Sequence, residues 1–328
     1  MDFTVETATA AVIESFQGAP DPRLREVLES LVEHLHDFVR DIEPTMAEWE
    51  AAIGFLTAVG RQCDDTRQEF VLLSDVLGVS MLVETLNGAE QGTESTVLGP
   101  FHMTASPRRE LGDTIDLLGT GRPCVVSGRV TSVDGTPLAG AELDVWQCSE
   151  DGFYDVQQPG VQPPGNGRGL FHTGPDGTYW FRTVIPSHYP IPTDGPVGDL
   201  LTATGRHPYR PAHIHFIAGA DGHRRVTTHA FVGGSPYLES DAVFAVKRGL
   251  IVDFTESHDP AAAAGFGVDA PFTHATFDIV LAPPLPGRDR CPDPYRVCDV
   301  EAGEQLSVGA ECQRPHRVDV AGEVRAGG

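Results

Sequence analysis

The chain of 328 residues has almost no lysine. Of its 23 basic residues only Lys247 is a lysine, and 47 acidic residues give a formal net charge of −24. No block of arginines could neutralise a run of phosphates or lie on an anionic membrane surface. No stretch approaches the roughly 18 consecutive apolar residues that a membrane span requires. We therefore expect no nucleic-acid partner and no membrane partner.

Features of a secreted protein are also missing. Residues 1–10 are acidic and rich in Thr and Ala, and they lack the basic and apolar regions of a secretory signal. Cysteines are few and irregularly spaced, unlike those of a disulfide framework. They are Cys63, Cys124, Cys148, Cys291, Cys298 and Cys312. We expect a cytoplasmic protein with free thiols.

The first hundred residues show helical periodicity. Between Pro22 and Ile42, apolar residues recur at the i, i+3, i+4, i+7 spacing that places one apolar stripe on a helix. Pro44 ends this helix, and residues 45–58 and 70–86 predict further helices. We expect a helical N-terminal domain over residues 1–100. Its long apolar stripe favours self-association through a two-fold interface.

After Gly99-Pro100-Phe101 the periodicity changes to 2, and Gly, Pro and Asp interrupt the sequence about every ten residues. This pattern is typical of a β-sandwich, so the predicted fold class is α+β, with the sandwich over residues 101–286. Residues 159–169 predict a loop, and residues 287–328 a C-terminal extension of unknown role. The expected strands are residues 124–131, 141–148, 178–184, 212–218, 226–232, 249–254 and 274–281.

The sharpest chemical signal is His213-Ile214-His215. Residues i and i+2 of a strand project from the same face, so both imidazoles can reach one ion. His229 could complete a three-imidazole zinc site, and Asp155 or Glu239 could complete a ferrous site of two histidines and one carboxylate. A third possibility is that the two histidines are merely structural.

Three ordered motifs resemble those of the intradiol ring-cleavage dioxygenases, the non-haem Fe(III) enzymes that open catechols between their two hydroxyls. They are Asp151-Gly152-Phe153-Tyr154, Ile185-Pro186-Ser187-His188-Tyr189-Pro190-Ile191-Pro192 and Arg210-Pro211-Ala212-His213-Ile214-His215. The resemblance extends from about Phe70 to Leu281. Residues 94–101 and 237–244 are most similar to the branch of the family that acts on hydroxyquinol.

The resemblance implies one Fe(III) ion per subunit, with Tyr154, Tyr189, His213 and His215 as its ligands. Fe(III) is a hard ion that suits anionic phenolate oxygens, and two neutral imidazoles complete the set. Tyr189 matches the ligand that leaves the ion and takes a proton from the substrate. Arg210 is expected to stabilise the negative charge that grows on the ring.

The implied substrates are a small aromatic diol or triol and O2, and the implied assembly is a homodimer through the N-terminal helices, with a possible bound phospholipid. Asp75 either accepts a hydrogen bond from a third ring hydroxyl, which favours hydroxyquinol, or caps a helix or pairs with an arginine. The implied pocket is lined by Leu72, Asp75, Val97, Leu98, Gly99, Pro100, Phe101, Ile191, Pro192 and Val243.

The sequence departs from the family pattern at His229, where many catechol-cleaving relatives have Gln, and in the tail after Pro286, which contains His316 and three cysteines. The alternatives are a catechol or chlorocatechol 1,2-dioxygenase, a zinc or iron hydrolase that uses His213, His215 and His229, and a transthyretin-like binding module fused to helices.

Overall fold

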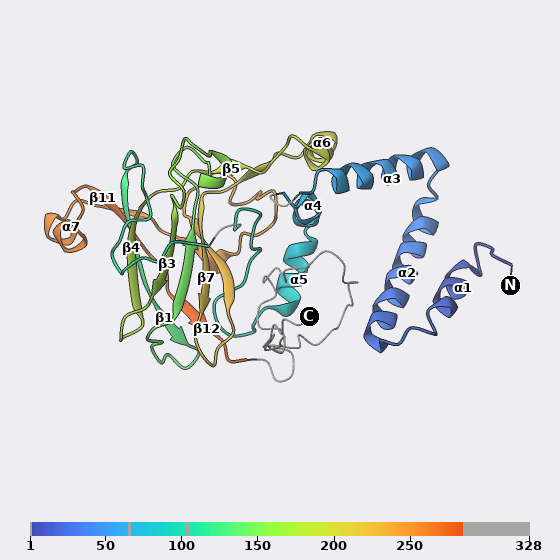
Figure 1. The fold of residues 1–328 in the computed structure, drawn as a ribbon, viewed down its shortest axis with the longest axis horizontal. Helices are drawn as coiled ribbons and strands as arrows, with labels where there is room; N and C mark the ends of the chain where they lie inside the picture. The colour runs from blue at the N-terminus through green and yellow to red at the C-terminus, as the bar shows by residue number, and fades with distance from the viewer. Residues whose placement is uncertain (1, 65–66, 103–104, 285–328) are drawn as a thin grey trace, which may run out of the picture. The chain divides into compact units, whose positions relative to one another are not determined.

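A computed structural model of the chain describes residues 2–64, 67–102 and 105–284 (Figure 1). The described chain divides into two compact units, which meet in the sequence between Glu50 and Ala51. The predictions for Cys291, Cys298, Cys312 and the rest of the tail lie outside the described residues. No helix in the described ranges is long and apolar enough to cross a membrane.

The first unit contains α1 (Ala8–Ser15), α2 (Pro22–Ile42) and the first turn of α3 (Met46–Arg61). The Asp21 side chain accepts hydrogen bonds from the backbone N–H groups of Arg23 and Leu24, and Pro22 is the first helical residue, so both residues favour the start of α2 at this point. The apolar stripe of α2 is exposed: Leu31, Leu35, Phe38 and Ile42 keep 49–56% of their accessible surface.

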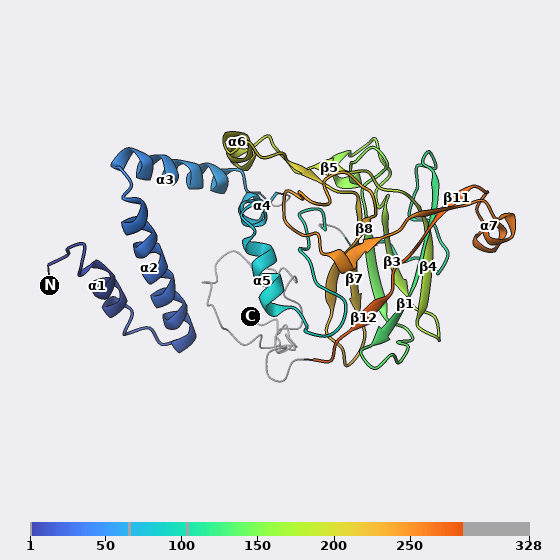
Figure 2. The same ribbon diagram turned by 180° about the vertical axis from the view of Figure 1, so that it is seen from behind.

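The second unit begins with the rest of α3, followed by α4 (Glu69–Val76) and α5 (Val79–Asn87). The segment 70–86 thus forms two helices, because Gly78 adopts a left-handed conformation (φ +71°) that interrupts them. Two shorter helices, α6 (Pro196–Ala203) and α7 (Pro260–Phe266), follow later in the chain. In both views α6 lies beside α4, whereas α7 lies beyond β11 (Phe272–Thr276) (Figures 1 and 2).

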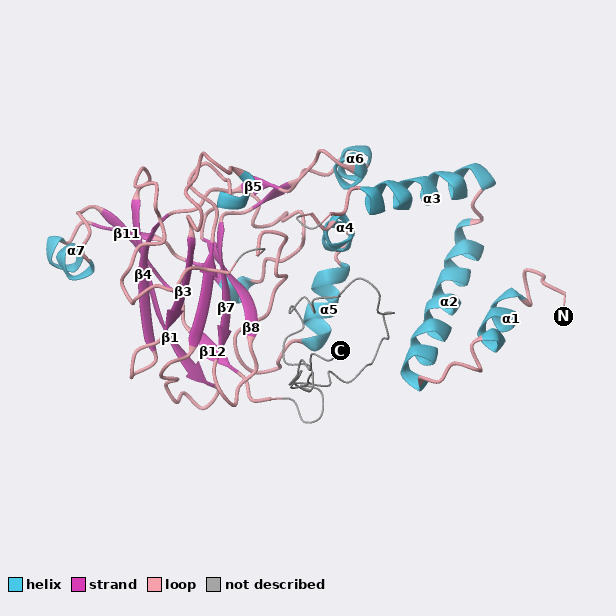
Figure 3. Ribbon diagram, viewed as in Figure 1, coloured by secondary structure: helices cyan, strands magenta, loops and turns pink. Residues whose placement is uncertain are grey.

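The second unit also contains two five-stranded sheets and one two-stranded sheet (Figure 3). The mixture of helices and mainly antiparallel strands confirms the α+β class. The first sheet has the order β10-β11-β1-β12, and β4 pairs with β1; the second has the order β3-β2-β7-β8-β9. The strands of the first sheet are β1 (Pro123–Ser132), β4 (Thr178–Val184), β10 (Thr255–Ser257), β11 and β12 (Ile279–Leu281). Those of the second are β2 (Glu142–Trp146), β3 (Arg168–His172), β7 (His213–Gly219), β8 (Val226–Val232) and β9 (Ile251–Val252).

Two strand predictions and one loop prediction are corrected. The predicted strand 249–254 is limited to β9, after a short 3-10 turn, and the predicted strand 274–281 is divided between β11 and β12. The predicted loop 159–169 ends early because β3 begins at Arg168. The Gly- and Pro-rich composition hid this strand, whose backbone pairs with β2 and whose Arg168 side chain is fully buried.

Both sheets contribute to one apolar core, with Val126 and Phe181 from the first sheet and Leu143 and Phe216 from the second. β7 is buried along its whole length. Its even-numbered residues enter this core, so that its odd-numbered residues, beginning with His213, face the other side of the sheet. There a second apolar cluster contains Trp146, Tyr154, Tyr189 and Ile217. The strand therefore directs its two histidines into a separate buried region.

Candidate metal centre

The register of three neighbouring strands places aromatic residues around His215. In the antiparallel pairs of β7, His215 lies opposite Trp146 of β2 and His229 of β8. The His215 ring stacks on the Trp146 indole with a centroid distance of 4.5 Å and an interplanar angle of 12°. His213 and His215 share a face because they are two residues apart on a strand. Both imidazoles are buried.

Two tyrosines reach this face from other segments. Tyr154 immediately precedes a 3-10 turn, and Tyr189 lies in β5 (Tyr189–Pro190), opposite Arg210 of β6 (Tyr209–Arg210). Gly152 allows the two segments to approach each other. Its backbone has a positive φ of +82°, and a Cβ added there would lie 3.2 Å from the His188 carbonyl oxygen and 3.3 Å from Tyr189 Cβ.

Four side-chain atoms meet at the centre of the site. Tyr154 Oη lies 3.0 Å from His215 Nε2 and 3.3 Å from Tyr189 Oη. His213 Nε2 lies 3.1 Å from His215 Nε2 and 3.5 Å from Tyr189 Oη. Ligand atoms that are each about 2 Å from one ion lie roughly 3 Å from one another. The four side chains therefore have the spacing of a metal-ligand set.

Burial keeps both histidines neutral, as metal ligands must be. Desolvation lowers the pKa of His213 and of His215 well below the ordinary 6.5, and the nearby Arg210 charge lowers both further. His213 Nδ1 lies 2.7 Å from the Pro211 carbonyl oxygen, which can only accept, so this nitrogen donates. The Nε2 lone pair of His213 consequently faces the centre.

The two phenols need a cation to ionise. Desolvation raises the pKa of Tyr154 well above 10 and also raises the pKa of Tyr189, although the Arg210 charge opposes both increases. A bound metal ion reverses this balance, because it stabilises the phenolate oxygen directly. The donor set of two phenols and two neutral imidazoles thus suits a hard, highly charged ion.

Arg210 is held at the centre by Asp241, which sequence reasoning did not select as a site residue. Arg210 Nε donates to Asp241 Oδ1 at 3.1 Å, and Arg210 Nη2 to Oδ2 at 3.4 Å. The remaining Nη1 lies 3.2 Å from His213 Nε2. Both side chains are only 2% exposed. A buried guanidinium requires a counter-charge. The sequence therefore held one indication of a nearby carboxylate, namely the arginine within a motif expected to be buried.

The carboxylates considered as metal ligands lie elsewhere. Asp155 accepts from Arg168 Nε at 2.8 Å and from the Gly165 N–H at 2.8 Å, and Glu239 is exposed. His229 belongs to a cluster of three histidines whose possible ligand atoms lie within 4.8 Å of one another. However, His229 Nε2 contacts His215 Nδ1 at 2.7 Å, on the side of that ring opposite to Nε2.

Three of the predicted pocket residues, Leu98, Gly99 and Phe101, lie against the residues of the centre. Phe101 stacks on Tyr154 with a centroid distance of 4.5 Å, and Gly99 (φ +77°) lies so close that an added Cβ would be 3.2 Å from His215 Cε1. Leu98 packs in the cluster of Tyr154 and Tyr189, whereas Pro100 and Pro192 are half-buried. The remaining apolar members, Leu72, Val97, Ile191 and Val243, are buried in the main core.

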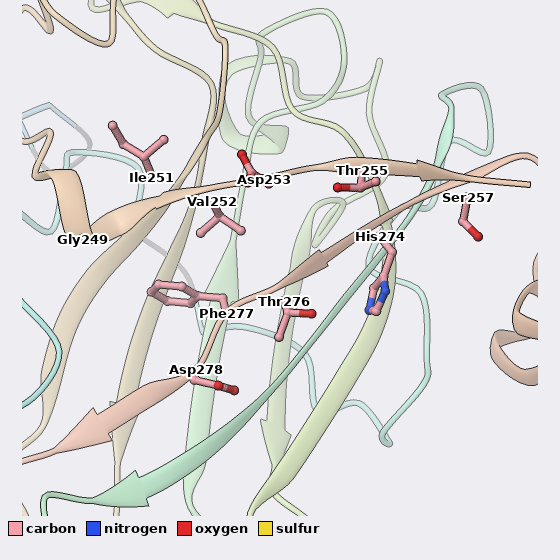
Figure 4. A pocket seen from close by; sticks show the side chains of 10 residues that line it. All are labelled: Gly249, Ile251, Val252, Asp253, Thr255, Ser257, His274, Thr276, Phe277 and Asp278. Carbon is pink, nitrogen blue, oxygen red and sulfur yellow. The ribbon is translucent and has the colours of Figure 1, made fainter.

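Asp75, on α4, is only 3% exposed. Desolvation raises its pKa to about 6, while a hydrogen bond from Ser80 and the charge of Arg210 oppose the increase. A hollow of about 550 Å³ in the described structure is lined by residues of the segments 249–257 and 274–278, such as Asp253 and His274, and by none of these site residues (Figure 4).

The chain matches two families of known proteins. The family described as "Dioxygenase" matches residues 99–283, and the family described as "Catechol dioxygenase N terminus" matches residues 21–94. Hydroxyquinol 1,2-dioxygenase of Rhizobium sp. (strain MTP-10005) is 49% identical over 283 residues, which cover 85% of this chain and 96% of that protein. The 6-chlorohydroxyquinol 1,2-dioxygenase of Cupriavidus pinatubonensis is 47% identical over 286 residues, which cover 87% of this chain and 99% of that protein.

A solved structure shows the same fold. The crystal structure of hydroxyquinol 1,2-dioxygenase from Pseudomonas putida DLL-E4 has a TM-score of 0.79 and 45% sequence identity. The match covers 85% of this chain and 99% of that one.

The raised pKa of Asp75 predicts a specific dependence of stability on pH. Since the folded protein holds this proton more tightly than the unfolded chain (pKa about 6 against 3.8), the contribution of Asp75 to the free energy of unfolding falls as the pH rises from about 4 to 6. The difference corresponds to about 3 kcal/mol. Urea unfolding of the wild type and of Asp75→Asn should show that the free energy of unfolding of the variant rises relative to that of the wild type as the pH increases from about 4 to 6. A constant difference between the two proteins would contradict the prediction.

Proposed function

Because the chain belongs to the intradiol ring-cleavage dioxygenase family, we propose that it cleaves hydroxyquinol (1,2,4-trihydroxybenzene) with O2 to 3-hydroxy-cis,cis-muconate, the enol form of maleylacetate, in aromatic degradation. The observation that carries this proposal is the buried cluster of Tyr154 Oη, Tyr189 Oη, His213 Nε2 and His215 Nε2, at separations of 3.0–3.5 Å. Relatives named for hydroxyquinol cleavage match 85% of the chain, which supports the substrate assignment.

Fe(III) is the ion that these residues would hold, with Tyr154, Tyr189, His213 and His215 as ligands. Two phenolates reduce its charge, and two neutral imidazoles add none, so the donor set fits a trivalent hard ion better than zinc. When bound, the ion would chelate the two adjacent oxygens of the substrate and draw electron density from the ring, which makes a ring carbon open to attack by O2. The position of His229 Nε2, against His215 Nδ1, argues against a three-histidine hydrolase.

The chain's own residues handle protons and charge. Tyr189 would be the ligand that leaves the ion and accepts a substrate proton at Oη. Its short strand β5 pairs with the two-residue strand β6, so its backbone is held by few strand hydrogen bonds. Arg210 Nη1, held by Asp241, lies beside the ligand atoms, where it stabilises negative charge on the reacting ring. Leu72, Val97 and Phe101 exclude water from the reacting carbon atoms.

Asp75 would select the substrate. Among apolar side chains, a carboxylate that accepts a hydrogen bond from a third ring hydroxyl favours hydroxyquinol over catechol. Leu98, Gly99, Pro100, Ile191, Pro192 and Val243 would complete the walls of the pocket. A catechol or chlorocatechol 1,2-dioxygenase is the alternative if Asp75 has no such role.

The first test joins metal content to the role of Tyr189. The purified protein should contain about one iron per chain and be red, because phenolate-to-Fe(III) charge transfer absorbs visible light. Tyr189→Phe should keep iron but lose at least a hundredfold in kcat, in line with the 10²–10⁴-fold contribution of a positioned acid or base.

Tyr179→Phe is the matched control. This tyrosine is equally buried, but its hydroxyl donates to the Phe277 carbonyl in the core, so activity and colour should be unchanged. A colourless protein that contains zinc, or full activity of Tyr189→Phe, would contradict the proposal.

The second test concerns Asp75. A charge-assisted hydrogen bond of about 1.5–3 kcal/mol predicts that kcat/KM for hydroxyquinol exceeds that for catechol at least tenfold. Asp75→Asn should narrow this ratio and leave the iron content unchanged. Oxygen uptake with hydroxyquinol, catechol and 4-chlorocatechol measures these kcat/KM values and their ratios. Equal use of catechol and hydroxyquinol by the wild type would assign the enzyme to the catechol branch.

The proposal extends to organisation: a helical N-terminal domain (1–100) that dimerises, a transthyretin-like β-sandwich (101–286) that holds the iron, and an extension (287–328), in a cytoplasmic enzyme. The family matches, which change near residue 95, support the first boundary. The exposed stripe of Leu31, Leu35, Phe38 and Ile42 supports a homodimer, and the same apolar surface would accept the acyl chains of a phospholipid.

Light scattering tests the dimer. The wild type should have the mass of two chains at micromolar concentration, and Phe38→Asp should have the mass of one, because a charge in the apolar interface lacks a partner. Val161→Asp replaces another exposed apolar residue (74% exposed), outside these helices, and should leave the mass unchanged. A monomeric wild type would rule out this assembly.

A further inference from the structure

The two histidines at the metal centre are held in different ways. His213 Nδ1 donates to a backbone carbonyl, that of Pro211, which no substitution of a side chain removes. His215 Nδ1 has only a side chain as its partner, His229 Nε2, at 2.7 Å. The orientation of His215 therefore depends on the chemistry of residue 229.

A second hydrogen bond extends this contact into a chain of three side chains. His229 Nδ1 lies 2.7 Å from Thr96 Oγ1, and the Thr96 backbone N–H donates to the Thr227 carbonyl at 2.8 Å, which fixes the threonine beside β8. Thr96, His215 and His229 are at most 1% exposed. No bulk water can replace either bond without opening the core.

The chain can be polarised in two directions. A neutral imidazole carries one N–H, so in the chain from His215 Nδ1 through His229 to Thr96 Oγ1 each ring donates with one nitrogen and accepts with the other. In one direction His215 Nδ1 donates to His229 Nε2, and His229 Nδ1 donates to Thr96 Oγ1. In the other, Thr96 donates to His229, and His229 donates to His215. Only the first direction leaves His215 Nε2 free of hydrogen, facing Tyr154 Oη and His213 Nε2.

We infer that His229 and Thr96 are positioning residues that hold His215 in the tautomer able to bind the ion through Nε2. The inference rests on the proposed function, and it gives His229 a role as an acceptor behind a ligand instead of a third ligand. A hydrogen bond from the remote nitrogen of a ligating imidazole fixes the ring and raises its basicity, and its loss typically weakens metal binding 10–100-fold.

Other residues enclose the His215 ring on its remaining sides. The Trp146 indole covers one face of the His215 ring, and Gly99 lies against its Cε1 edge. His215 is thus unable to rotate away from His229, and only the direction of the hydrogen bonds remains to be set. In the direction that leaves His215 Nε2 free of hydrogen, the Thr96 hydroxyl oxygen is the acceptor for the Nδ1 proton of His229.

Two matched pairs of variants test the inference. His229→Gln retains an acceptor, the amide oxygen, whereas His229→Leu has none; Thr96→Ser retains the hydroxyl, whereas the isosteric Thr96→Val does not. Competition with a chelator should show iron affinity reduced about 10–100-fold in His229→Leu and in Thr96→Val, and within about threefold of the wild type in the other two variants. The visible charge-transfer maximum should shift only in the two variants that lose the hydrogen bond.

A measurement on the metal-free wild type tests the tautomer directly. Nitrogen-15 NMR of the histidine rings should show the proton of His215 on Nδ1 and that of His229 on Nδ1. A proton on Nε2 of His215, or wild-type iron affinity and colour in both His229→Leu and Thr96→Val, would overturn the inference. Thermal unfolding identifies a variant that fails to fold, and the threonine pair then decides the result.

The result that would refute the proposed function differs from the result that would refute the positioning role. A wild-type protein that neither retains iron nor consumes oxygen with hydroxyquinol would refute the function, whatever the NMR result. A red, active wild type whose His229→Leu and Thr96→Val variants bind iron equally well would refute only the positioning role.

Discussion

The register of β7 between β2 and β8 is the constraint on which the site depends. β7 is buried on both faces. The alternation of its side chains therefore decides which residues enter the main core and which face the metal centre. A slip of one residue would put Phe216 at the centre and His215 into the apolar core, at the cost of a buried polar ring without a partner. The same register brings Trp146 and His229 to His215.

Buried charge is compensated in pairs around this centre, in a chain with a net charge of −24. Asp241 neutralises Arg210 on one side. On the other, Arg168 contacts Asp155, the neighbour of Tyr154, and its Nη2 donates to the Phe101 carbonyl at 2.9 Å. Each pair is costly to break, because one partner would remain as an unpaired charge in the interior. Arg168 thus connects Phe101 with the Tyr154 segment, while Asp241 holds Arg210.

Close approach is the other requirement, and glycine satisfies it at two points. Gly152 lets the Tyr154 segment contact the Tyr189 segment, and Gly99 lets the loop before Phe101 lie against His215. Both have positive φ, so a larger residue would suffer backbone strain as well as a clash. The site is built from segments far apart in the chain, and these glycines allow them to meet.

Local sequence determined the features that depend on near neighbours: the start of α2 at Asp21-Pro22, the pairing of His213 with His215 on one face, and most of the strands. Ordered motifs containing Tyr154, Tyr189 and Arg210 also indicated the family. Only the tertiary structure decided which partners meet across long separations, namely Asp241 with Arg210 and Thr96 with His229, and that β3 exists within a Gly-rich segment. Hydrogen bonds and ion pairs depend on distance in space, and local periodicity carries no information about a partner 31 or 133 residues away.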